Sequence, residues 1–301
     1  MISSLDPSYL AFLNAMDAIQ QREQTDQTQL STGLRINQIS DAPGQLNSLF
    51  NTQSQIAQLD QVNSNLKLVQ TETSAADSAL QSATQILDQV QSLATQAEPT
   101  STSASTRTTI SQQVGDALTN LVHLANTAVN GRYIFSGDSD QTQPYTIDLT
   151  QANPVSAYAG SASTRQIALP DGSQIPVALT AQQIFDSSNA QTNVFNAVNS
   201  LRTALQNNDQ AGIDSAISTL ASASQYLNQQ LAQYGGIENQ LTNAATAGQT
   251  MSTQLQTQLA NIQDADLSKA IVDLNQTALQ QQAALGAEAK MPQQSLFNYL
   301  G

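Results

Sequence analysis

The strongest constraint on the fold of this chain is a long alternation of three- and four-residue spacings between apolar side chains. It runs through Leu59, Val62, Leu66, Val69, Thr73, Ala76, Leu80, Ala83, Leu87, Val90 and Ala94, with Thr73 as its one polar member. Because such positions share one helix face, the pattern predicts a helix over residues 43–97, roughly 80 Å long at 1.5 Å per residue. Ser40 or Asp41, just before Pro43, is expected to cap it. A stripe of this length has to pack lengthwise against other helices.

Similar stripes recur on both sides of the chain's middle. They cover residues 110–128, 194–205 and 213–234, and the last extends to about residue 262. At residues 263–266 the stripe slips by one residue, which moves the apolar face. The simplest arrangement packs the N-terminal helices antiparallel to the C-terminal ones.

The segment between these helices has a different character. Residues 132–189 contain short alternating runs and several prolines. We expect strands at residues 133–135 and 145–149, and a hairpin that joins residues 167–169 to 175–177 around Pro170-Asp171-Gly172-Ser173. Pro176 makes the second hairpin strand an edge strand.

These patterns predict a mainly α fold: an elongated antiparallel helical bundle or coiled coil formed by both chain ends, with a small central β-rich domain. Residues 1–40 with 262–301 are expected to form terminal assembly helices. Residues 41–131 with 190–261 are expected to form a helical bundle, and residues 132–189 a small β-rich outer domain.

The terminal stripes are weaker than the central ones. In the first helix the seam is interrupted by Glu23 and Asp26, so its short apolar face cannot offset the entropy of ordering it alone. We therefore predict an assembly interface that forms only against a partner. Its residues are Leu5, Tyr9, Phe12, Met16, Ile19, Leu30, Leu267, Ile271, Leu274 and Leu285.

Composition excludes several classes of protein. The formal net charge is -14 and the basic residues are scattered, which argues against nucleic acid and anionic membranes as partners. No apolar run approaches a membrane span, and the start lacks an ordinary secretory signal, so these signals alone would place the chain in the cytosol. The absence of cysteine rules out disulfides and thiolate metal sites.

The residues of an enzyme site are also lacking. His123 is the one histidine and lies on a predicted helix, which favours a packed or rim side chain. The segment Gly137-Asp138-Ser139-Asp140-Gln141-Thr142 begins like a calcium loop but lacks the glycine and glutamate that complete one. We expect no catalytic residue, no metal site and no cofactor.

Motifs near both ends resemble those of the bacterial flagellin family. Leu30-Ser31-Thr32-Gly33-Leu34-Arg35-Ile36-Asn37 resembles the signature that ends the family's first helix. Ile262-Gln263-Asp264-Ala265-Asp266-Leu267 resembles the motif that opens its terminal helix, and Ser295-Leu296-Phe297-Asn298-Tyr299-Leu300 resembles its end. The resemblance covers roughly residues 1–135 and 185–301.

Within this family the chain is most similar to the hook–filament junction branch, also called the third hook-associated proteins. Asp41-Ala42-Pro43 and the segment Asn130–Gly137 resemble that branch, as do Tyr158-x-Gly160 and the Asp171-Gly172 hairpin with Ile184-Phe185. The final Phe297-Asn298-Tyr299-Leu300 also fits it better than the usual flagellin end. The start, Met1-Ile2-Ser3-Ser4, lacks the basic residue of many junction proteins, and a filament-forming flagellin is the alternative.

The resemblance implies a structural role in motility rather than catalysis. Such proteins are exported unfolded by the flagellar type III apparatus without a cleaved signal, which would reverse the cytosolic placement. Their termini fold into a coiled coil on assembly. The implied partners are copies of the same chain, other hook-associated proteins, flagellin and a flagellar export chaperone, with no nucleic acid and no membrane insertion.

A helical protein of a secretion apparatus, or a signalling coiled coil of the chemoreceptor kind, would also carry long acidic heptads. Chemoreceptors need a membrane span, which the sequence lacks. The β insertion and the terminal motifs argue against both classes.

Overall fold

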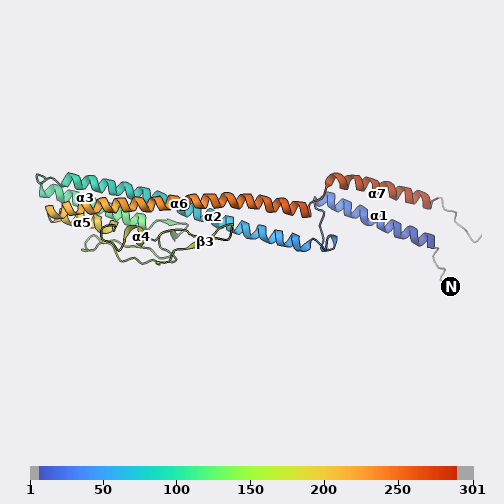
Figure 1. Cartoon of the computed structure of the whole chain (residues 1–301), viewed down its shortest axis with the longest axis horizontal. Coiled ribbons are helices and arrows are strands. Elements are labelled where there is room, and N and C mark those ends of the chain that lie inside the picture. The colour runs from blue at the N-terminus through green and yellow to red at the C-terminus, as the bar shows by residue number, and fades with distance from the viewer. Residues whose placement is uncertain (1–6, 290–301) are drawn as a thin grey trace, which may run out of the picture. The chain divides into compact units, whose positions relative to one another are not determined.

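A computed structural model describes residues 7–289 of the chain, and its fold is mainly helical, as the stripes predict (Figure 1). The helices are α1 (Pro7–Thr32), α2 (Leu46–Ala97), α3 (Ala104–Ala125), α4 (Ala181–Phe185), α5 (Val194–Gln206), α6 (Gln210–Gln263) and α7 (Leu267–Glu288). A 3-10 turn, η1, covers Ile39–Asp41. The short strands are β1 (Ala128–Val129), β2 (Arg132–Tyr133), β3 (Gln166–Ala168) and β4 (Gln174–Pro176).

The chain divides into two compact units. The terminal unit contains the residues up to Gln58 and from Ser252 onward, and the bundle unit contains Leu59–Met251. Helices α2 and α6 contribute to both units.

The bundle unit is built on the long α2 stripe. Every stripe residue from Leu66 to Ala94 is buried, as the spacing predicts. In the main hydrophobic cluster the stripe packs with apolar side chains of α3, α5 and α6. The extended helix expected after residue 213 is also confirmed, because α6 continues to Gln263.

One end of the bundle unit is fastened by Arg107 of α3, which is only 4% exposed. Its guanidinium donates to the carbonyl oxygens of Ala97, the last residue of α2, and of Pro99 just after it. It also donates to the side-chain oxygens of Asn208 and Gln210, at the turn into α6. A cation at the C-terminus of α2 is stabilised there by the helix dipole.

Two small hairpins lie in the segment that connects α3 to α4. Strands β1 and β2 pair across Asn130 and Gly131, both at positive φ as a two-residue hairpin turn requires. Strands β3 and β4 pair around Pro170–Ser173, which confirms the expected hairpin. Residues 145–149 do not form the expected strand, because Ile147 makes only an isolated bridge to Val155.

An aromatic cluster holds this connecting segment on the bundle. Phe135 meets Phe185 and Tyr234 edge-on, each with ring centroids 6.2 Å apart. Tyr158 donates a 3.0 Å hydrogen bond to the carbonyl oxygen of Phe135, and burial raises the pKa of Tyr158 to about 12. Aromatic burial therefore does much of the packing that the short strands cannot provide.

The expected cap of the second helix is wrong. Asp41 does not cap α2: its Oδ2 accepts from the backbone N–H groups of Asn37 and Gln38, at 2.8 and 2.7 Å, and so stabilises the preceding turn η1. Helix α2 begins only at Leu46, after a further turn that contains Pro43 and Gly44.

Candidate assembly interface

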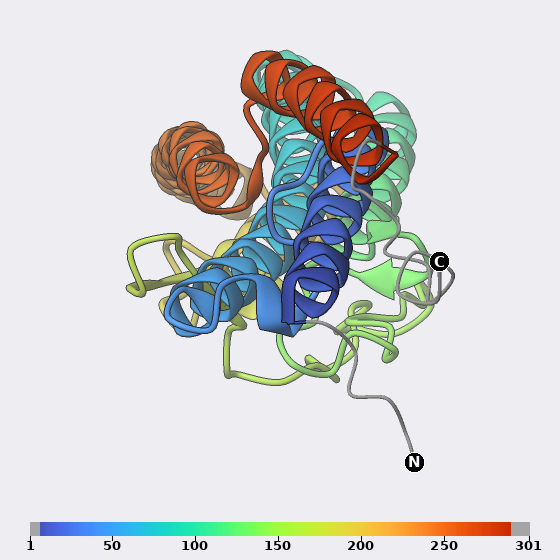
Figure 2. The ribbon, with the colours of Figure 1, turned by 90° about the vertical axis from the view of Figure 1, so that its right-hand side faces the viewer.

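The terminal unit pairs α1 with α7, which lie side by side and antiparallel (Figures 1 and 2). On α1 the half-buried side chains follow the spacing seen in the sequence. At the stripe positions they are Phe12, Met16, Ile19, Glu23, Asp26 and Leu30, with Thr28 and Gln29 half-buried beside them, whereas Tyr9 is 41% exposed. Leu5 lies outside the described residues.

The face of α7 that packs against α1 is not the face that carries its apolar stripe. Its buried residues are Ala270 and Thr277, and Leu274 is half-buried. Leu267, Ile271 and Leu285 are 46%, 51% and 53% exposed. Small and polar residues fit better than leucines against the acidic middle of the α1 seam. Three apolar side chains of the α7 stripe, Leu267, Ile271 and Leu285, are therefore largely uncovered among the described residues.

The middle of the helix pair is polar and acidic. Arg22 and Asp26 of α1 line a small open pocket together with Asp273 and Thr277 of α7. Burial, with the nearby carboxylate of Asp273, raises the pKa of Asp26, while the positive charge of Arg22 opposes the shift. This acidic contact weakens the helix pair at neutral pH.

The two sequence motifs meet where the paired helices end. Gly33 closes α1 with φ +72°, and its carbonyl oxygen accepts a 2.9 Å hydrogen bond from Ala265 N–H. The Arg35 N–H donates in turn to the Gln263 carbonyl oxygen at 2.7 Å. We call these paired connectors, residues 33–36 and 262–266, the clasp.

The side chain of Arg35 reinforces the clasp. Its Nη2 donates at 2.6 Å both to the carbonyl oxygen of Ile262 and to Oε1 of Gln45. Asp266 then starts α7 by accepting from the Lys269 N–H at 3.0 Å. No sequence pattern gave Arg35 a role, although it stands inside the first motif.

The terminal unit buries few apolar side chains. Among the described side chains of α1, from Tyr9 to Thr32, none is buried, and on α7 only Ala270 and Thr277 are. A helix pair with so little covered apolar surface is marginal by itself. That the terminal helices fold firmly only against further partners stays a prediction.

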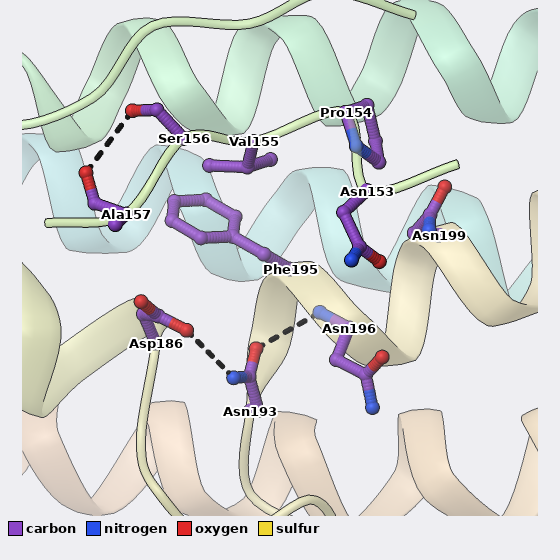
Figure 3. Close-up of a pocket in the computed structure, with 10 residues that line it drawn as sticks. All are labelled: Asn153, Pro154, Val155, Ser156, Ala157, Asp186, Asn193, Phe195, Asn196 and Asn199. Atoms are coloured by element: carbon purple, nitrogen blue, oxygen red, sulfur yellow. Dashed lines mark hydrogen bonds between the residues drawn. The ribbon is translucent and has the colours of Figure 1, made fainter. Parts of the chain in front are cut away.

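A pocket on the bundle unit shows no catalytic arrangement (Figure 3). Asp186 accepts a 2.8 Å hydrogen bond from the Asn193 side chain, whose own oxygen caps α5 by accepting from Asn196 N–H. The Phe195 ring beside them is almost fully buried. These groups therefore stabilise the start of α5.

The remaining candidates from the sequence are His123 and groups of possible metal ligands. His123 is exposed on α3. Over residues 7–289 no three acidic, histidine or cysteine side chains are grouped so as to hold a metal ion. Within the same range no helix has an apolar stretch long enough to cross a bilayer.

Comparison with known proteins identifies relatives of both chain ends. The bacterial flagellin N-terminal helical region matches residues 4–140, and the bacterial flagellin C-terminal helical region matches residues 213–300. The flagellar filament 33 kDa core protein of Treponema phagedenis is 26% identical over 281 residues, which cover 92% of each chain.

Solved structures share the fold. A Vibrio parahaemolyticus protein described as a flagellar hook-associated protein has a TM-score of 0.65 at 18% identity, covering 74% of this chain and all of that one. FlgL of Bacillus cereus has a TM-score of 0.55 at 20% identity, covering 71% of this chain and all of its own. The fold predicted from the sequence is thus one that known flagellar proteins adopt.

Proposed function

The chain belongs to the bacterial flagellin family and is a flagellar structural protein, and on that basis we propose that it is the subunit that joins hook to filament. Self-association through paired terminal helices is its central activity in this proposal. It has no catalytic role.

The observation that carries the junction assignment is the segment Asn130–Gly137, which resembles the entry into the outer domain of junction proteins. Its residues have defined structural tasks here. Asn130 and Gly131 make the β1–β2 turn, and the buried Phe135 anchors the segment through its carbonyl oxygen, which accepts from Ala181 N–H at 2.8 Å. This resemblance favours the junction role over the filament role in our proposal.

A filament-forming flagellin is the second candidate. The curated relatives, which match about nine-tenths of the chain, carry flagellin or filament names, as FlaB1 of Treponema pallidum does. Both roles use the same terminal helices, so the two candidates differ in where the protein resides in the flagellum.

The assembly interface proposed here has two parts. The seam of Phe12, Met16, Ile19 and Leu30 packs within the chain against α7, and the exposed stripe of Leu267, Ile271 and Leu285 packs on neighbouring copies. Leu5, Tyr9 and Leu274 extend these surfaces. In this proposal other hook-associated proteins and flagellin contact the assembled copies.

Export by the flagellar type III apparatus, with an export chaperone, follows from the same role. A marginal terminal unit is easily kept unfolded during passage, and the exposed α7 stripe needs cover until assembly.

Locating the protein in isolated flagella tests the junction assignment. Immunogold labelling is expected at the hook end only, and a deletion strain is expected to secrete filament protein without attaching it. Labelling along the filament would overturn the junction role and support the filament alternative.

Substitution of Ile271 tests the assembly stripe. The variant Ile271→Ser is expected to abolish assembly into sedimentable polymers while leaving the urea unfolding of the bundle unit unchanged, because the side chain is 51% exposed. Lys269→Ser, two residues before Ile271 on α7 and also exposed, is the matched control and should assemble normally. Normal assembly of Ile271→Ser would remove this residue from the interface.

A further inference from the structure

The core of the bundle unit is divided into two hydrophobic clusters. The larger cluster begins at Ala76 on α2, ends at Tyr234 on α6, and includes α3 and α5. The smaller one contains Leu66 and Val69 of α2, Leu241 and Ala244 of α6, and Ile167 and Val177 of the β3–β4 hairpin region. The apolar packing between α2 and α6 is therefore interrupted between Val69 and Ala76 on α2 and between Tyr234 and Leu241 on α6.

Polar groups of α2 occupy this level. Glu72, 4% exposed, forms an ion pair with Arg165 of the connecting segment. Thr73, the one polar member of the α2 stripe, donates from Oγ1 to the Val69 carbonyl oxygen at 2.9 Å. This local bond to the preceding turn is a feature that bends helices.

The opposite helix carries a glycine pair at the same level. Gly235 and Gly236 lie in the middle of α6, directly after Tyr234. Nothing lies within 4 Å of the position that a Cβ would take at either residue, so close packing does not require them. The other α6 glycines differ, because a Cβ at Gly212 would meet Asp209 and one at Gly248 would meet Asn63.

Packing is also incomplete at this level. A cavity of about 10 Å³ lies among Glu72, Thr73, Arg165 and Tyr234. Just beyond it, Asp77 of α2 and Glu238 of α6 bring like charges together, relieved only in part by the 3.1 Å hydrogen bond from Ser74 Oγ to Glu238. Four features therefore lie at the same level of the bundle: the interrupted apolar seam, the glycine pair, the cavity and the contact between acidic side chains.

We propose that Gly235-Gly236 is a hinge in α6, and that the Glu72–Arg165 ion pair is a latch that limits its bending. The hairpin part of the bundle unit then changes its angle to the four-helix part without disturbing either apolar cluster. This goes beyond the structural role proposed above, because it gives each subunit an internal joint that adjusts it to curvature in an assembly.

The bending is measurable because the chain contains no cysteine. Spin labels on Gln225→Cys and Ala247→Cys, both exposed, bracket the hinge by roughly 33 Å along the helix. A broad distance distribution is expected in the full chain, and the double variant Gly235→Ala with Gly236→Ala should narrow it. A second pair at Ala211→Cys and Gln229→Cys lies on one side of the hinge and should be narrow in both backgrounds.

Removal of the latch should have the opposite effect. Replacing Glu72 and Arg165 together by methionine avoids leaving an unpaired buried charge, and should broaden the Gln225–Ala247 distribution. Amide exchange gives an independent readout: the double alanine variant should slow exchange at residues 235–240 by about tenfold. Equal distance distributions and equal exchange in the parent and the alanine variant would overturn the proposal.

Discussion

Arg35 donates a 2.6 Å hydrogen bond from Nη2 to the carbonyl oxygen of Ile262, joining two residues that lie 227 positions apart. The bond connects the two motifs that most resemble the flagellin family. The resemblance of these motifs to the family therefore has a physical basis. The two motifs form the two sides of the clasp, which holds the ends of α1 and α6 together.

Loss of the Arg35 side chain should loosen the clasp. We expect Arg35→Ala to lower the free energy of unfolding of the terminal unit by about 1 kcal/mol, since the lost hydrogen bonds have a charged donor but are solvent-exposed. Exchange of the Ala265 amide, which donates to Gly33, should accelerate about fivefold by nuclear magnetic resonance. Lys67→Ala, which removes an exposed positive charge from α2, is the control and should leave that amide unchanged.

Acidic pH should strengthen the α1–α7 pair. The pKa of Asp26 is raised in the folded unit, mainly by burial and then by Asp273, so the stability from this group is present at low pH. That stability is lost as the pH rises through the folded pKa, which lies above the ordinary value of 3.8. Helix content is therefore expected to fall between mildly acidic and neutral pH.

Asp26→Asn isolates this effect. By circular dichroism the variant should exceed the parent in helix content at pH 7, and the two should converge as the pH falls. Asp17→Asn, on the exposed side of α1, is the matched control and should show no such convergence. A difference between Asp26→Asn and the parent that is the same at both pH values would contradict this account.

The parts of the fold that the sequence predicts are those in which one face of a helix decides the packing. The α2 stripe predicted the buried face correctly, because its apolar side chains all lie on one side of the helix. For α7 the apolar stripe and the α1-facing surface differ, because the partner seam contains Glu23 and Asp26. The buried face of a weak helix depends on its neighbour's chemistry, which no pattern within α7 reveals.

Polar contacts between distant segments were missed for a related reason. Arg107 stands three residues before Ile110 and so continues the α3 stripe toward its start, a signal that a buried arginine was possible. Its acceptors come from two other parts of the chain, the end of α2 and the turn into α6, and only the fold brings them together.

Arg107 should therefore be a main stabilising residue of the bundle unit. Arg107→Met leaves two backbone carbonyls and two side-chain amides without their donor, and we expect a loss of about 2–4 kcal/mol in the free energy of unfolding. Urea denaturation of the full chain measures it. Arg132→Met removes a partly exposed ion pair with Asp140 and should cost less than about 1 kcal/mol. Equal losses for both variants would mean that Arg107 acts only as surface charge.

Gly137 should be the least replaceable glycine of the connecting segment. It has φ +63°, and a Cβ there would lie 2.2 Å from the Ser161 carbonyl oxygen and 2.6 Å from that of Ser163. Both oxygens belong to backbone that is hydrogen-bonded to this turn, through Ser161 N–H to Ser136 and Asp138 N–H to Ser163. Gly137→Ala therefore combines a left-handed backbone with a clash that the neighbouring chain cannot relieve cheaply, and we expect a loss of about 3 kcal/mol or more.

Gly172 provides the matched comparison, because it has φ +84° but open space around the Cβ position. Gly172→Ala should lower the free energy of unfolding only by the backbone strain, about 1 kcal/mol. Thermal unfolding of the two variants separates the contributions: the difference between them is the clash at Gly137. If Gly137→Ala unfolded at the same temperature as Gly172→Ala, the close approach of residues 161–163 to this turn would have to be looser than the structure places it.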